Sequence, residues 1–130
     1  MTTRTSTQSG NWRADDVDTW GLGADTYPAA GEHVVIASGH NITLGESNNA
    51  GSIRCNGGTI TGGGHTLTLN DGGEADIFYN TGTLSGEVNI NITGTTSRGI
   101  YNNGTGHLHD IDINSDVLAK TFTAGFTLRC

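Results

Sequence analysis

The chain is 130 residues long, which suits one domain with a small hydrophobic core. Hydrophobic residues make up only 33% of it, and glycine contributes 21 residues. The formal net charge is −7, and with 6 basic residues there is no basic stripe for phosphates, which excludes sustained nucleic-acid binding. No stretch reaches the about 20 apolar residues of a membrane span, and the N-terminus lacks the apolar segment of a signal peptide. We therefore expect a protein made in a cytosol, with no membrane partner.

Residues 1–31 differ from the rest of the chain because they contain both tryptophans and show no repeat. Trp12, Trp20 and Pro28 all lie in this segment. Large aromatic side chains can cover the open end of a stack of strands, so we predict that residues 1–31 form an N-terminal cap. An aromatic sugar-binding platform is the alternative interpretation.

From residue 32 onward, short alternating strands and glycine-rich turns follow one another, and a short motif repeats. Its copies begin at Asn56, Asn80 and Asn103, and each copy leads into an alternating strand. A fixed period of this size is typical of a solenoid, in which one structural unit lies on the next. The asparagines at this corner, Asn56, Asn80 and Asn102 or Asn103, could form a ladder from turn to turn.

Apolar residues keep the same period, which predicts columns of inward-facing side chains. The predicted columns are Ile42, Leu67, Ile90 and Ile111; Leu44, Leu69, Ile92 and Ile113; Ile60, Leu84 and Leu108; and Ile53, Ile77 and Ile100. Three short strands per turn of about 23 residues predict an all-β parallel β-helix of about four rungs over residues 32–130, with the cap part of the same single domain.

Few residues suggest chemistry. His107 and His109 are two residues apart on one strand, a spacing that can chelate a transition metal, although an outward polar face explains them as well. Outward carboxylates are too scattered for a polysaccharide-cleaving site, and no Ser/His/Asp order, CxxC motif or phosphate loop occurs, so we expect no enzyme and no cofactor. Cys55 and Cys130 are placed too far apart along the axis for an intrachain disulfide; whether either forms an intermolecular one is left open.

An ordered series of motifs opens the chain. It consists of Ser9-Gly10-Asn11-Trp12, Asp18-Thr19-Trp20-Gly21, Pro28-x-x-Gly31 and Val34-Val35-Ile36-x-Ser38-Gly39-His40. The series resembles the opening of β-helical surface proteins, including the eight-glycine domain, and of small structural proteins of tailed bacteriophages. It departs from them at Glu32, where an aspartate is usual. The resemblance implies an N-terminal lead-in to a right-handed β-helix and brings no catalytic residues with it.

These patterns favour a non-enzymatic virion protein, either a capsid decoration or a fibre-associated β-helix. We expect this protein to self-associate as a trimer. The residues expected at its interfaces with other copies or with a capsid protein are Trp12, Trp20, Phe122, Phe126 and Leu128. One alternative is a carbohydrate-binding or adhesive module that uses Tyr79 and Tyr101. Another is the subunit of a head-to-tail extracellular filament.

Overall fold

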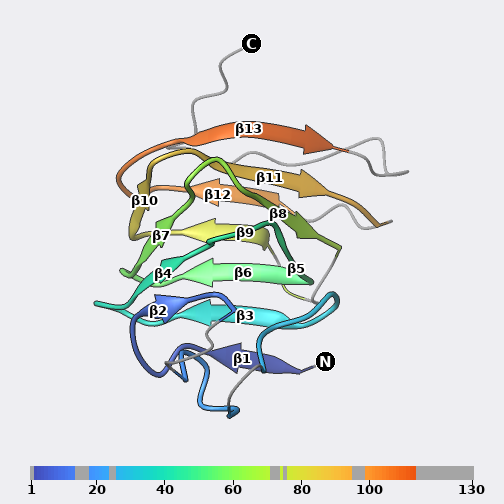
Figure 1. Ribbon diagram of the computed structural model, residues 1–130. Helices are drawn as coiled ribbons and strands as arrows, with labels where there is room; N and C mark the ends of the chain where they lie inside the picture. The colour runs from blue at the N-terminus through green and yellow to red at the C-terminus, as the bar shows by residue number, and fades with distance from the viewer. Residues whose placement is uncertain are drawn as a thin grey trace.

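The computed structural model describes residues 2–13, 18–23, 26–70, 74, 76–94 and 99–113, and the described residues form strands and turns without a helix (Figure 1). The strands belong to three parallel sheets, which we name A, B and C. Sheet A contains β1 (Thr3–Thr5), β3 (His33–Ile36), β6 (Ser52–Cys55), β9 (Asp76–Asn80) and β12 (Gly99–Asn102). Sheet B contains β2 (Gly10–Asn11), β4 (Asn41–Thr43), β7 (Thr59–Thr61) and β10 (Thr83–Ser85). Sheet C contains β5 (Asn48–Ala50), β8 (Thr66–Leu69), β11 (Val88–Ile92) and β13 (Leu108–Ile113).

The chain visits the three sheets in turn, so it winds as a parallel β-helix, which confirms the predicted fold class. The sets β3–β4–β5, β6–β7–β8 and β9–β10–β11 make about three complete turns, compared with the about four predicted. Strands β1 and β2 form a partial turn below them, and β12 and β13 form another above. In Figure 1 the turns lie one above another, with β1 at the bottom and β13 at the top.

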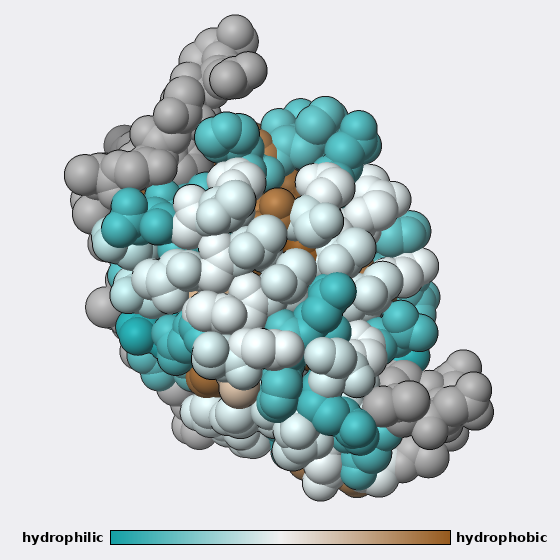
Figure 2. Space-filling view, turned by 90° about the vertical axis from the view of Figure 1, so that its left-hand side faces the viewer, coloured by the Kyte–Doolittle hydropathy of each residue, from teal (hydrophilic) through white to brown (hydrophobic). Residues whose placement is uncertain are grey.

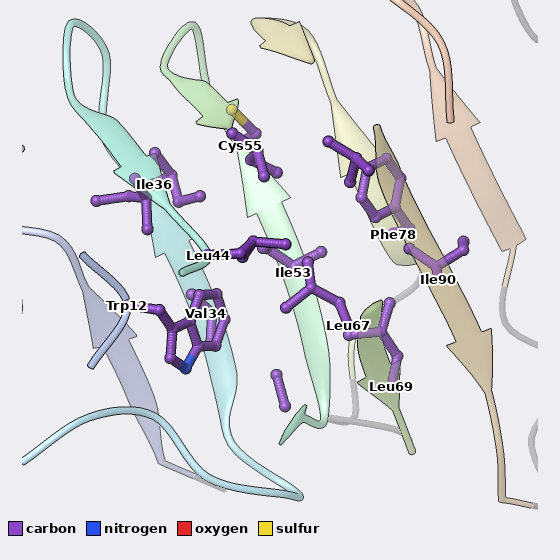
Figure 3. Packing of buried hydrophobic residues seen from close by; sticks show 14 of the residues in the cluster. Trp12, Val34, Ile36, Leu44, Ile53, Cys55, Leu67, Leu69, Phe78 and Ile90 are labelled. Carbon is purple, nitrogen blue, oxygen red and sulfur yellow. The ribbon is translucent and has the colours of Figure 1, made fainter. Parts of the chain in front are cut away.

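The core is a narrow stack of buried hydrophobic side chains, part of which Figure 3 shows from close by. Strands such as β7, β8 and β11 bury alternate residues, which is why so lean an apolar content is enough. Several predicted alignments are confirmed by strand register: Leu67 with Ile90 and Ile111, Leu69 with Ile92 and Ile113, and Ile60 with Leu84.

The first complete turn is shorter than the sequence repeat predicts. Paired residues of β3 and β6 are 19 positions apart, whereas those of β7 and β10 are 24 apart. The prediction that Ile42 begins the Leu67 column is therefore wrong, because Ile42 pairs with Ile60 in sheet B. Leu67 pairs instead with Asn48 of β5, and Leu44 likewise lies outside its predicted column.

Two other alignments fail near the top of the stack. Leu108 pairs with Val88 in sheet C and does not lie above Leu84, because the last turn has lost residues between its second and third strands. Ile53 and Ile100 both pair with Phe78 and not with Ile77, and the register of β9 and β12 shifts by a residue just before this pairing. Ile77 and Phe78 are both fully buried at this irregularity.

The lower end of the core is closed by the tryptophans. Trp12 is fully buried and Trp20 is 4% exposed, and their rings meet edge to face with centroids 5.3 Å apart. Trp20 Nε1 donates a hydrogen bond to the Trp12 carbonyl oxygen at 2.8 Å, while Arg13 Nε donates to Asn48 Oδ1 at 2.9 Å. Through these contacts the segment after β2 covers the lower strands. Residues 1–31 also contribute β1 and β2, which pair with β3 and β4.

The upper end of the described core is less covered. Leu108 and Ile111 are partly buried, and Ile113 is 40% exposed. Directly below Ile113, Ile92 and Leu69 of the same column are fully buried. The two ends therefore differ in how much apolar surface they leave in contact with water.

Candidate functional site

The outward side of sheet A carries an aromatic stack. Arg54, Tyr79 and Tyr101 pair in register on β6, β9 and β12. The Tyr79 and Tyr101 rings lie 4.8 Å apart and 12° from parallel, and the Arg54 guanidinium lies 4.2 Å from the centre of the Tyr79 ring. One face of Tyr79 thus meets an aromatic ring and the other meets a cation. The two tyrosines that were expected to contact a glycan do lie side by side, but their rings stack on each other.

Beside this stack, His33 and Ser52 form a buried pair. The His33 Nδ1 and Ser52 Oγ atoms are 2.7 Å apart, and His33 Nε2 lies 3.8 Å from Glu74 Oε1. Burial lowers the pKa of His33, against the opposing attraction of Glu74. Although Ser, His and Glu are the components of a hydrolytic triad, Ser52 is only 1% exposed and His33 5%, so no substrate can reach the hydroxyl. This pair is structural, and sequence reasoning missed it because the two residues belong to different turns.

A second polar cluster ties β1 to the loop that precedes β3. Arg4 Nη2 lies 2.7 Å from Glu32 Oε1, and Arg4 Nε donates to the same oxygen at 3.0 Å. The Ala29 N–H donates to the other carboxylate oxygen. These bonds, that from Arg4 above all, hold the pKa of Glu32 below its ordinary value. Glu32 is the position at which the opening series departs from the usual aspartate. Through Arg4, it joins β1 to the start of the first complete turn of the β-helix.

The asparagine ladder exists in part. Asn80 Nδ2 donates to Asn102 Oδ1 at 2.8 Å, and both residues are buried. Asn56 is not part of the ladder, since Cys55 holds the position that pairs with Asn80 and Asn56 is exposed. Cys55 is a buried free thiol, and burial raises its pKa to about 11, so it is a core residue and not a nucleophile.

His109 lies at the surface near two acidic side chains. Its Nε2 is 3.7 Å from Glu87 Oε1, and its Nδ1 is 3.3 Å from Asp110 Oδ2. His107 is exposed and precedes β13. Across the described ranges, no three His, Cys, Asp or Glu side chains gather as they would around a metal ion.

The outward side of sheet B is built differently from that of sheet A. On its three complete turns it presents a grid of two columns, which we name the threonine face: Asn41, Thr59 and Thr83 in one column, and Thr43, Thr61 and Ser85 in the other. Asn11 extends the second column below, and Thr105 extends the first above. None of these residues is charged, although the chain has a net charge of −7. Figure 2 shows the side on which β2, β4, β7 and β10 lie, and much of its middle has the pale colour of intermediate hydropathy.

A column of glycines sets the register of the threonine face. Gly58, Gly82 and Gly104 precede Thr59, Thr83 and Thr105 and lie directly on one another. A Cβ on Gly82 would lie 2.0 Å from the Gly58 carbonyl oxygen, and one on Gly104 would lie 2.0 Å from the Gly82 oxygen. Backbone bonds of 2.8 Å run from the Thr83 N–H to the Gly58 oxygen and from the Thr105 N–H to the Gly82 oxygen. The repeated motif in the sequence therefore encodes a close backbone approach that admits no side chain.

The predicted interface residues fall into two groups. Trp12 and Trp20 are buried inside the core, where they close it and have almost no surface left to offer a partner. Phe122, Phe126 and Leu128 lie outside the described residues. Cys130 lies outside them too, so the expectation that it forms no disulfide with Cys55 stays a prediction.

Comparison with known proteins adds nothing to this geometry, since no family model, no curated protein and no solved structure matches the chain. The resemblance of residues 9–44 to β-helical surface and phage proteins stays a prediction. In the described part of the chain, no helix is long and apolar enough to span a membrane.

Proposed function

We propose that this protein is a non-enzymatic structural protein that self-associates, as a capsid decoration or fibre-associated β-helix of a virion. The observation that carries the proposal is the difference between the two ends of the core. Ile113 is 40% exposed, whereas Trp12 and Val34 at the opposite end are fully buried. Apolar area removed from water stabilises an assembly by about 25 cal/mol per Å².

The reactive side chains of the described residues also favour assembly over catalysis. Its Ser–His pair is buried, its thiol has a raised pKa, and its carboxylates do not gather in a metal-binding cluster within the described ranges. A sugar-binding role is the weaker alternative, because sugars stack on open aromatic faces and both faces of Tyr79 are occupied.

The test is the mass of the purified full chain in solution, measured by sedimentation over a range of concentrations. We expect an oligomer, by preference a trimer, which Ile113→Asp weakens because a carboxylate at the upper end would have to be desolvated. Asp112→Asn is the matched control, since it changes the neighbouring outward residue of the same strand and should leave the mass unchanged. Deletion of residues 121–130, which contain the predicted Phe122, Phe126 and Leu128 contacts, should also reduce association.

A stable, monodisperse monomer of the intact chain would overturn the proposal. Retention of the oligomer by Ile113→Asp would place the contact elsewhere and remove the observation on which the proposal depends. A glycan array with Tyr79→Ala and Tyr101→Ala variants addresses the alternative, because tyrosine-dependent binding to a sugar would favour it.

A further inference from the structure

We infer that the threonine face is a binding surface for crystalline ice. The first observation is its regularity. Sheet B shows no register shift in any of its described pairings, whereas β9–β12 in sheet A and β11–β13 in sheet C both do. Adjacent strands are about 4.8 Å apart and alternate residues on one strand about 6.7 Å apart. Water oxygens on a prism face of hexagonal ice repeat at similar intervals in two perpendicular directions.

The second observation is the chemistry of the grid. A threonine side chain presents one hydroxyl, which both donates and accepts hydrogen bonds, and one methyl group that orders water around it. A β-branched side chain on a strand is stiff at χ1, so the grid is held in place before any ligand arrives. The hydrogen bond from Thr61 Oγ1 to Asn41 Oδ1, at 2.9 Å, fixes one point further. Many weak contacts can therefore form together without a large cost in ordering.

The third observation is what the face lacks. Among the described residues of the grid there is no Trp, Tyr or Arg, the side chains that dominate protein interfaces. It has no aromatic ring on which a polysaccharide could stack, and no basic residue for a polyanion. A neutral, rigid and repeating surface fits a neutral and repeating ligand.

Sheet C does not offer the same surface, although Thr66 and Thr68 are outward on β8. Its upper strand carries Asp110 and Asp112. Asn89 is already bonded within the molecule, since its Nδ2 donates to the Gly64 oxygen and its Oδ1 accepts from the Asp110 N–H. This difference supplies a matched control on the same protein.

The experiment uses the full chain and two variants, Thr61→Tyr and Thr68→Tyr. Thr61 pairs with Thr43 and Ser85 in sheet B, and Thr68 pairs with Asn49 and Asn91 in sheet C. Thermal hysteresis and ice shaping are measured by nanolitre osmometry, and uptake of the labelled protein into a growing ice hemisphere is measured in parallel. We expect the unmodified chain to shape ice and enter it, Thr61→Tyr to lose both effects almost completely, and Thr68→Tyr to retain them. Circular dichroism melts establish that both variants are folded.

Exclusion of the unmodified chain from ice would overturn the inference, and so would an equal loss in Thr68→Tyr. Dissociation of an oligomer by Thr61→Tyr, without any effect on ice, would identify the face as a contact between copies and would also overturn it. The result is separable from the proposed structural role, because Ile113→Asp tests that role at the end of the stack and should leave ice uptake unchanged.

Discussion

Sheets A and B have the same inward and outward alternation, yet their outward surfaces are used in opposite ways. On sheet A, outward groups contact one another: Arg54 lies over Tyr79, and Tyr79 stacks on Tyr101. On sheet B, within the described ranges, the Thr59 and Thr83 side-chain hydroxyls have no hydrogen-bond partner in the protein. Sheet A therefore uses its outward side chains to stabilise the stack. On sheet B, Thr61 and Asn41 bond to each other, but the Thr59 and Thr83 hydroxyls stay available to water or a ligand. The stability of sheet B therefore comes mainly from the backbone and the core.

The largest effect is expected from Gly82→Ala, which tests whether sheet B depends on its backbone. The new Cβ would lie 2.0 Å from the Gly58 carbonyl oxygen, so two turns must move apart. We expect the free energy of unfolding, measured in urea, to fall by about 4 kcal/mol or more, as for the most severe single substitutions.

Gly39→Ala is the control for this substitution. Gly39 has a φ of 81°, and a Cβ there would meet nothing within 4 Å. Its cost should be backbone strain alone, about 1–2 kcal/mol. If Gly82→Ala costs no more than Gly39→Ala, the glycine column is not closely packed and does not set the register of the threonine face.

The next prediction is that stability depends on pH through the sheet A side of the molecule. The pKa of His33 is lowered by burial, so the unfolded chain binds a proton more readily and stability falls as pH decreases from the ordinary value of 6.5 toward the folded value. The pKa of Glu32 is lowered by its bond to Arg4, so a second loss follows as pH falls below 4.5. Urea midpoints measured at a series of pH values should show both steps.

His33→Gln should remove the first step and leave the second. The control is His107→Gln, which changes an exposed histidine and should leave both steps in place. If the first loss of stability persists in His33→Gln, another titrating group causes it. The pH dependence would then no longer distinguish sheet A from sheet B.

The sequence predicts the solenoid and the upper columns because apolar alternation repeats faithfully there. Leu67, Ile90 and Ile111 follow a nearly constant interval, and so they are aligned correctly from the pattern alone. The prediction is wrong for the first turn because that turn is shorter and because a buried asparagine, Asn48, holds the position below Leu67 at which Ile42 is expected. A polar residue satisfied by backbone carbonyls cannot be distinguished by pattern from an exposed one.

The candidate surfaces were less accessible to sequence reasoning than the fold. The columns that align Thr59 with Thr83 are implied by the same repeat, yet their significance depends on register across all of sheet B. The Tyr79–Tyr101 stack depends on the one-residue register shift between β9 and β12, which no pattern in the local sequence predicts. Strand periodicity therefore predicts which residues face outward, whereas the contacts among them depend on bulges and on turn lengths.

A smaller effect is expected from separating the tyrosine rings. In a double-mutant cycle with Tyr79→Leu and Tyr101→Leu, the coupling free energy should be about 1 kcal/mol, the usual value for an aromatic pair. The corresponding cycle with Thr59→Val and Thr83→Val should give a coupling near zero, because the two hydroxyls make no bond to each other. Equal coupling in both cycles would contradict the contrast between the two sheets.

The smallest effect is expected from Thr83→Val alone. Valine keeps the shape and the strand preference of threonine and removes only a hydroxyl, which has no partner in the described part of the protein, so the free energy of unfolding should change by no more than about 0.5 kcal/mol. Ser52→Ala on sheet A is the comparison, because it removes the 2.7 Å contact with His33 and leaves a buried ring nitrogen unsatisfied. That change should cost about 1–3 kcal/mol. If Thr83→Val is as costly as Ser52→Ala, the hydroxyl has a partner within the protein, and the threonine face is not free to bind an external ligand.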